Sequence, residues 1–161
     1  MASNPDAYGR ALAEIQKQME NIESDFSQFV TLNSSGDPVE AAEILDKTED
    51  RILALTQIVE KVPAIVEDLT EKLPDQLEDL ESGYRKLLET NYHFIETDLE
   101  ARFQQLRASL KRNEENLAAL ELDNALYENE QIQEEIDALY AIFTREIEAH
   151  IVVEKLVNYL P

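Results

Sequence analysis

The sequence contains no cysteine among its 161 residues. Disulfide bonds and zinc sites built from thiolates are therefore excluded, and the composition suits a reducing cytoplasm. Glycine occurs 3 times and always alone, so the glycine-rich loop that cradles phosphate is missing. No run approaches 18 consecutive apolar residues, and the first residues lack the basic and apolar regions of a signal peptide. We expect a soluble chain without a targeting segment.

Positive charge is scarce as well. The chain has 14 basic residues against 35 acidic ones, which gives a formal net charge of −21. Such a surface repels phosphate groups, so nucleic acids and anionic lipid headgroups are poor partners. Hydrophobic residues nevertheless make up 43% of the chain and recur at helical spacing. This pattern favours a packed interior over disorder, with the charges on solvated helix faces.

Residues for catalysis, metal binding or cofactor binding are not evident. The only two histidines, His93 and His150, each follow a glutamate by four residues, which is typical of an ordinary pair on a solvated helix face. The Glu-x-x-His pairs of di-iron helical bundles are missing. The sequence therefore predicts no catalytic residues, no metal and no cofactor.

Two apolar stripes with alternating spacings of four and three predict a pair of antiparallel helices. The first stripe consists of Tyr8, Leu12, Ile15, Met19, Ile22, Phe26 and Phe29. The second stripe consists of Ala41, Leu45, Thr48, Ile52, Leu55, Val59 and Val62. Between them, Gly36 breaks the pattern, Asp37 can cap the next helix, and Pro38 and Glu40 suit its first turn. If the second stripe is buried, Ile52→Asp should lower the melting temperature strongly.

Two prolines divide the chain beyond the second stripe. Apolar positions continue past Pro63, so we expect a kink there, whereas Pro74 followed by acidic residues is typical of a new helix. The chain is therefore expected to reverse near residue 73, and again at Glu121-Leu122-Asp123. Around residues 91–95 the apolar pattern loses its phase, which fits either one bent helix or two helices. The predicted helices cover about residues 5–34, 38–72, 74–91, 94–119 and 123–159.

An internal repeat is indicated when the chain is compared with itself at an offset of 84 residues. This offset superposes pairs of apolar residues from two helices: Ile52 and Ile136, Leu55 and Leu139, Met19 and Phe103, and Ile22 and Leu106. Because 84 is a multiple of seven, chance alignment of heptads is the alternative. True repetition would give a first helical repeat at 1–91 and a truncated second one at 92–161. We expect an all-α, elongated fold, because a 30-residue helix is about 45 Å long.

One region of the chain is locally positive. Between Arg85 and Arg112, six basic residues occur with four acidic ones, so an acidic partner can bind there, or the charges can pair within the bundle. Aromatic residues at the phase break pose a similar choice between packing at a repeat junction and anchoring a partner. The candidate partner surface or repeat junction consists of Tyr84, Arg85, Tyr92, His93, Phe94, Arg102 and Arg107.

Short motifs along the chain resemble those of a known family. They are Tyr8-Gly9, Gly36-Asp37-Pro38-Val39-Glu40-Ala41, Glu81-Ser82-Gly83-Tyr84-Arg85-Lys86-Leu87-Leu88 with Asn91-Tyr92-His93-Phe94-Ile95, and Glu146-Ile147-Glu148-Ala149. Together they resemble the EzrA family of septation ring formation regulators, over nearly all residues from Tyr8 onward. The chain has neither the membrane anchor nor the C-terminal Gln-Asn-Arg patch of that family, so it looks like an internal piece.

The resemblance implies tandem spectrin-like antiparallel three-helix bundles with long, partly shared helices. It also implies a non-enzymatic scaffold that modulates FtsZ ring assembly on the cytoplasmic face of the membrane at the division septum. The implied partners are FtsZ and other division proteins, and the membrane is reached only through an anchor absent from this chain. Weak self-association is left open by the sequence itself. No residue here matches a motif with an assigned FtsZ contact. The alternative is a dimeric coiled-coil spacer without direct FtsZ contact, although the capped reversals favour packing within one chain.

Overall fold

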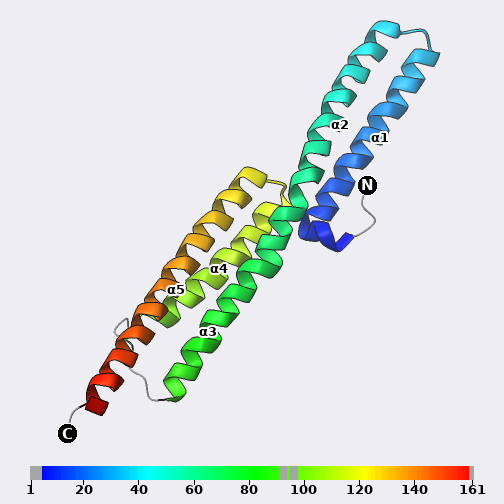
Figure 1. The fold of residues 1–161 in the computed structure, drawn as a ribbon. Helices are drawn as coiled ribbons and strands as arrows, with labels where there is room; N and C mark the ends of the chain where they lie inside the picture. Colours follow the sequence, from blue (N-terminus) through cyan, green and yellow to red (C-terminus); the bar gives the residue numbers. More distant parts are fainter. Residues whose placement is uncertain (1–4, 91–93, 95–97, 160–161) are drawn as a thin grey trace. The chain divides into compact units, whose positions relative to one another are not determined.

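The computed structural model describes the backbone of residues 5–90, 94 and 98–159. Helices account for nearly all of these residues and no strand occurs among them, which confirms the all-α class (Figure 1). The elements are the 3₁₀ segment η1 (Pro5–Ala11), α1 (Leu12–Ser34), α2 (Pro38–Glu67), the π-helical turn η2 (Asp68–Lys72), α3 (Leu73–Glu89), α4 (Leu99–Ala118) and α5 (Leu122–Tyr159). They form two compact units, the first from residues 1–67 and 114–126, the second from residues 68–113 and 127–161.

The turn between α1 and α2 is closed on both sides by local hydrogen bonds. Gly36 has a φ of 85°, and the N–H of Asp37 donates to the carbonyl of Leu32 at 3.1 Å. This left-handed closure satisfies a carbonyl that the end of α1 would otherwise leave free. The N–H of Glu40 donates to Oδ1 of Asp37 at 3.3 Å, so Asp37 caps α2. The predicted reversal and its cap are confirmed.

The turn between α4 and α5 uses the same closure with leucine in place of glycine. Leu120 has a φ of 58°, and the N–H of Glu121 donates to the carbonyl of Asn116 at 2.9 Å. A side chain in this left-handed region costs roughly 1–2 kcal/mol. The reversal predicted at this place is confirmed, and α5 begins at Leu122.

The reversal predicted near residue 73 is wrong. Helical residues follow one another without a break from Pro38 to Glu89, as α2, the π-helical turn and α3. As predicted, α2 does not stop at Pro63. Pro74 lacks an N–H and its ring crowds the carbonyl four residues earlier, so a regular α ladder cannot pass it unchanged. The π-helical turn directly before α3 changes the ladder at this place, and Pro74 marks a change of helix type.

Two helices begin later than predicted. α1 begins at Leu12 because Gly9 interrupts the preceding residues with a φ of 51° and a ψ of −135°. α4 begins at Leu99 and not near residue 94. The phase break itself falls largely on residues 91–93 and 95–97, which lie outside the part of the chain that the structure describes.

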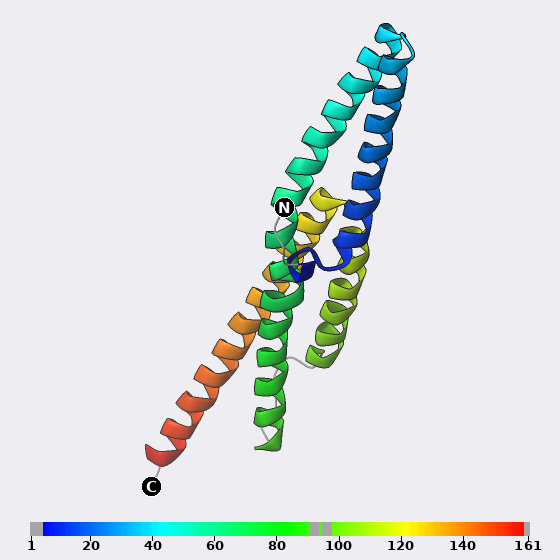
Figure 2. The same cartoon turned by 90° about the vertical axis from the view of Figure 1, so that its right-hand side faces the viewer.

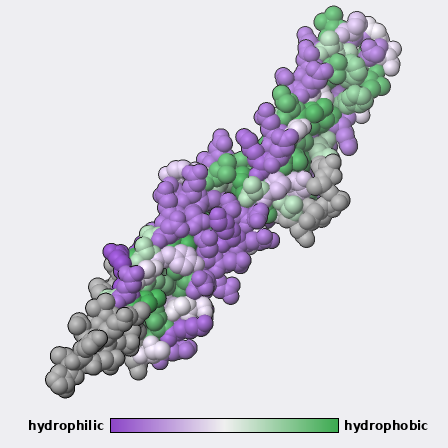
Figure 3. Space-filling view, in the orientation of Figure 1, coloured by the Kyte–Doolittle hydropathy of each residue, from purple (hydrophilic) through white to green (hydrophobic). Residues whose placement is uncertain are grey.

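The first unit has a core at one end of the α1–α2 hairpin and a thin seam along the rest. Tyr8, Ala11 and Ile15 are buried near the start of α1, and on α2 burial recurs every seven residues, at Ala41, Thr48, Leu55 and Val62. Other members of the stripes reach water, as the hydrophobic atoms at the hairpin surface show (Figure 3). Examples are Phe26 at 54% and Ile52 at 47% exposure. Ile52 was expected in the core, and that expectation is wrong because two helices alone cover only a narrow stripe of each other.

The core of the second unit is contributed by three helices. α3, α4 and α5 lie side by side along this core (Figures 1 and 2). Its buried residues are Leu73, Leu77, Leu80, Leu99, Phe103, Leu106, Ile132, Ile136, Leu139, Ile142 and Phe143. A buried amide pair lies between α4 and α5, where Nδ2 of Asn113 donates to Oδ1 of Asn129 at 2.7 Å. Such a pair favours one register of the two helices.

Candidate interaction surface

Each of the three seams between the helices of the second unit is crossed by a polar bridge. Between α4 and α5, Nε of Arg102 donates to Oε1 of Glu135 at 2.7 Å. Between α3 and α5, Nε2 of Gln133 donates to Oε1 of Gln76 at 2.8 Å. These side chains cover the core on both sides of α5.

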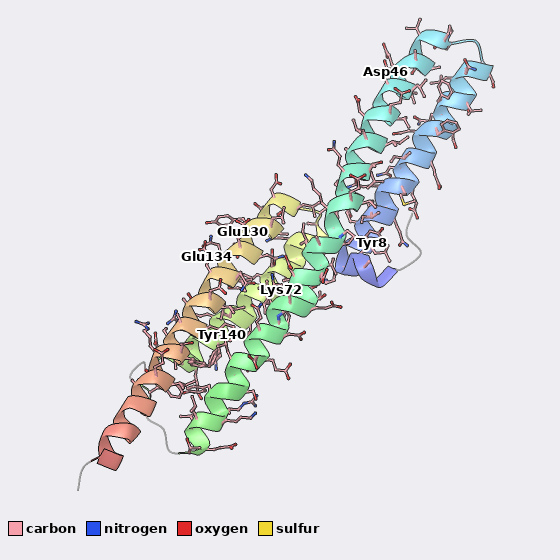
Figure 4. The ribbon with its side chains drawn as sticks, in the orientation of Figure 1. Tyr8, Asp46, Lys72, Glu130, Glu134 and Tyr140 are labelled. Atoms are coloured by element: carbon pink, nitrogen blue, oxygen red, sulfur yellow. The ribbon has the colours of Figure 1, made fainter. Side chains whose placement is uncertain are left out.

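Tyr140 adds a second bridge between α5 and α3 (Figure 4). Its hydroxyl donates to Oδ2 of Asp79 at 3.1 Å. Partial burial of the phenol raises the pKa of Tyr140, and the hydrogen bond to Asp79 raises it further, because a phenolate would face a carboxylate. The seam thus holds the neutral form of Tyr140.

The third seam, between α3 and α4, contains two cavities as well as a bridge. One cavity of about 390 Å³ is lined by Glu81, Tyr84, Arg85, Glu100, Phe103, Gln104 and Arg107. An adjacent cavity of about 370 Å³ is lined by Pro74, Leu77, Glu78, Arg85, Arg107 and Leu110. Because the two cavities share Arg85 and Arg107, we treat them as one α3–α4 groove.

A bidentate pair crosses the middle of the α3–α4 groove. Nε of Arg107 donates to Oε1 of Glu81 at 2.7 Å, and a second guanidinium nitrogen of Arg107 bonds the other carboxylate oxygen. The hydrogen bond to Glu81, and then the negative charge of Glu81, raise the pKa of Arg107. The paired guanidinium and carboxylate leave little net charge at this point of the groove.

Aromatic rings cluster at the larger cavity. The ring centroid of Tyr84 lies 5.5 Å from that of Phe103 and 5.0 Å from that of Phe94. Phe143 stacks on Tyr84 at 6.4 Å, with an interplanar angle of 7°. Phe103 and Phe143 are buried, whereas Tyr84 and Phe94 are half-buried. Two rings of this aromatic cluster, Tyr84 and Phe103, therefore line the larger cavity among charged side chains.

The structure separates the candidate residues into several groups. Tyr84, Arg85 and Arg107 line the α3–α4 groove, and Phe94 joins the aromatic cluster. Arg102 lies on the α4–α5 seam, paired with Glu135. Tyr92 and His93 lie outside the described residues.

Several groove residues were missed by the sequence prediction, among them Glu81, Glu100 and Gln104, which line the larger cavity. Leu88 lines neither cavity but is 42% exposed one turn beyond Arg85 on α3. A signal for Leu88 existed, because Leu87 and Leu88 are adjacent and a helix cannot turn both toward one core. No sequence signal distinguished Glu100 from the other acids of α4.

Among the side chains that the structure describes, no three His, Asp or Glu side chains come close enough to hold a metal ion. No helix in the described part of the chain has the length and apolar character that crossing a bilayer requires.

The fold and the groove define a class, namely all-helical proteins that present charged and apolar side chains on the outside of antiparallel helices. The whole chain, residues 1–161, matches the family model of EzrA, the septation ring formation regulator. The chain belongs to the EzrA family, and the resemblance inferred from its motifs is confirmed.

Curated relatives agree with this assignment. The chain is 81% identical to a septation ring formation regulator EzrA of Streptococcus sanguinis strain SK36 over all 161 residues. It is 71% identical to the EzrA of Streptococcus gordonii strain Challis and 66% identical to that of Streptococcus pneumoniae strain ATCC 700669, again over its full length. The chain spans 28% of the length of each of these relatives. They are named as regulators of septation, and no enzyme family is indicated. No solved structure matches the chain.

Proposed function

We propose that this chain is a scaffold segment of a septation regulator that modulates FtsZ ring assembly through protein–protein contacts. Membership of the EzrA family over all 161 residues is the observation that carries the proposal. The described surface supports it, because a groove lined by aromatic and charged side chains suits contacts with a protein. In the longer relatives the segment would work on the cytoplasmic face of the membrane at the septum, where the family resemblance implies an N-terminal anchor.

The same proposal includes a spectrin-like array of three-helix repeats. Residues 84 positions apart support it, because the difference in their burial is the one that a missing third helix would cause. Ile136 is fully buried beneath α3, whereas Ile52 on α2 is 47% exposed. Likewise Leu106 is buried in the three-helix core, whereas Ile22 on α1 is only half-buried. In this arrangement the α1–α2 hairpin is a repeat whose third helix, equivalent to α3, comes from another part of the longer protein.

The function is tested by adding the purified chain to polymerising FtsZ and measuring light scattering and pelleted polymer. A direct regulator should reduce both in proportion to the added chain. An unrelated helical protein of similar negative charge serves as the control, because charge alone can bind the cations that polymers need. Unchanged FtsZ polymers would favour the alternative, a spacer segment without direct FtsZ contact.

The repeat architecture is tested with a longer piece of the same protein. A chain extended at its N-terminus by about 30 further residues should protect the amides of α1 and α2 from hydrogen exchange and raise the melting temperature. Unchanged protection of α1 and α2 would mean that the third helix lies elsewhere.

A further inference from the structure

One face of the α1–α2 hairpin exposes large apolar side chains. Phe26 on α1 is 54% exposed and Ile52 on α2 is 47% exposed. The residues 84 positions later, Leu110 and Ile136, pack in the core to which α3 contributes. The side of the hairpin with Phe26 and Ile52 is therefore the side that a third helix would cover, and we call it the open face.

The bridges to α3 in the second unit identify the two edges of the open face. The side chains that bond α3 are those of Arg107 on α4 and of Gln133 and Tyr140 on α5. The residues 84 positions earlier are Glu23 on α1 and Glu49 and Thr56 on α2, and all three are exposed. Glu23 and Glu49 thus lie where the side chains of a third helix would form bridges, one on each helix of the hairpin.

Acidic side chains gather along both edges of the open face. Steps of three and four residues from Glu23 and Glu49 follow these edges over residues 16–30 and 46–60. The charged residues at these steps are Glu20, Glu23, Asp46, Glu49 and Glu60, and none of them is basic. Both edges therefore carry negative charge alone.

The basic residues of the hairpin lie on the other sides of its helices. Those between residues 12 and 67 are Lys17, Lys47, Arg51 and Lys61. At about 3.6 residues per turn, each lies about 120° or more around its helix from Glu23 or Glu49. Lys17 and Arg51 line a cavity of about 320 Å³ together with Glu14, and Arg51 pairs with Asp25. The acidic excess of the whole chain does not explain this segregation, because it would affect every face alike.

We propose that the third helix of this repeat is an amphipathic helix with lysine or arginine along both edges of its apolar stripe. The stripe covers Phe26 and Ile52, and the basic side chains pair with Glu23 on one edge and Glu49 on the other. Covering the open face removes water from these carboxylates, and without an opposite charge that loss opposes the packing of the helix. The proposal rests on the repeat architecture proposed above and adds the chemistry of its third helix.

A helix with the charges of α3 does not meet this requirement. In the second unit, α3 presents Glu81 to Arg107. The equivalent position of a third helix on the hairpin faces Glu23, so a glutamate there would place two carboxylates together. The acidic edges thus select a basic helix and reject one that resembles α3.

The test compares the 161-residue chain with a chain extended at its N-terminus by about 30 further residues, and E23R and E49R are made in both. In the extended chain each substitution should lower the hydrogen-exchange protection of the α1 and α2 amides roughly tenfold or more, because it places two positive charges together. In the 161-residue chain each should leave the protection unchanged or raise it, because it relieves repulsion between carboxylates. Circular dichroism of the shorter variants should show an unchanged fold, since both glutamates are exposed.

D50R is the matched control. Asp50 is exposed and lies about 100° around α2 from Glu49, so D50R changes the net charge equally but away from the open face. Its effect should be the same in both chains, and a loss of protection confined to E23R and E49R in the extended chain supports the proposal. Extension that protects both helices, with E23R and E49R matching D50R, would overturn the basic edges alone. Extension that leaves α1 and α2 unprotected would overturn the repeat architecture and this proposal with it.

Discussion

At the scale of single residues, the two tight turns form a natural comparison, because both need left-handed backbone. Gly36 fills this position after α1 and Leu120 fills it after α4. Leu120→Gly should raise the free energy of unfolding by about 0.5–1 kcal/mol, since relief of the left-handed strain exceeds the loss of a half-buried side chain. Gly36→Ala should lower it by about 1 kcal/mol, although no atom lies within 4 Å of the added methyl group. Urea unfolding of both variants measures the two effects, and a destabilised Leu120→Gly would show that the contacts of Leu120 matter more than its backbone.

Tyr140 provides a prediction with a defined pH dependence. Tyr140→Phe removes the hydrogen bond to Asp79 and should lower the free energy of unfolding by about 1 kcal/mol at neutral pH. The pKa of Tyr140 is raised in the folded protein, so the folded state holds this proton more tightly than the unfolded state. The resulting stability is fully present below the unfolded pKa of about 10 and is lost as the pH rises through the folded pKa.

The measurement is urea unfolding of wild type and Tyr140→Phe at about pH 8 and about pH 11. The difference between the two proteins should shrink at the higher pH. The other tyrosines titrate in both proteins and cancel in the comparison. A difference that is constant with pH would mean that Tyr140 contributes only through packing.

At the scale of elements, the sequence predicts the stripes but does not show how many helices cover them. Ile52 and Ile136 occupy equivalent positions in the same pattern, yet Ile52 is 47% exposed and Ile136 is fully buried. The burial of Ile136 depends on α3, which lies against α5 in the core of the second unit. A local sequence pattern cannot show whether a corresponding third helix covers α2. For the same reason, periodicity overestimated the core of the hairpin.

Aspartate substitutions at these two positions measure the difference. Ile136→Asp should lower the free energy of unfolding by about 4 kcal/mol or more, because it buries a carboxylate among apolar side chains. Ile52→Asp should lower it by less than about 1 kcal/mol, because the new charge reaches water. Thermal and urea unfolding provide the measurement. Equal losses would mean that the α1–α2 hairpin buries Ile52 in solution, for example against a second chain.

Turn chemistry was predictable only where it was distinctive. Asp37 and Pro38 carry a cap and a first-turn proline, and the chain reverses there. Pro74 carries much the same signature, but the helical residues continue through it by way of a π-helical turn. A proline lacks the same N–H in both settings, and packing of Leu69, Leu73 and Leu77 into the interior decides which outcome is more stable.

The residues that line the α3–α4 groove were only partly predictable from the sequence. The positive region from Arg85 to Arg112 contains Arg85 and Arg107, which line the groove, and its role as a partner surface stays a prediction. Sequence could not show that Arg102 turns to Glu135 on another seam, because that depends on the rotation of α4 about its axis. It also could not place Glu100 in the cavity that it shares with Arg85.

At the scale of the whole molecule, the excess of acidic residues opposes folding. The chain has 35 acidic residues, and the ion pairs found among the described side chains are Arg51 with Asp25, Arg102 with Glu135, and Arg107 with Glu81. Pairs at a protein surface contribute only about 0–1 kcal/mol each. Repulsion among the remaining carboxylates is therefore the larger long-range term, and it destabilises the compact state more than the unfolded chain.

Added salt should accordingly stabilise this protein. The screening length is about 10 Å at 0.1 M ionic strength and about 3 Å at 1 M, so sodium chloride weakens repulsion between distant carboxylates more than attraction within a close pair. The melting temperature should rise by several degrees between about 0.02 M and 0.5 M sodium chloride, as measured by circular dichroism at low protein concentration. E134R, which removes one negative charge and adds a positive one, should show a smaller rise than the wild-type chain. A melting temperature that falls with salt would mean that the few ion pairs, and not the repulsion, dominate the electrostatics of the folded state.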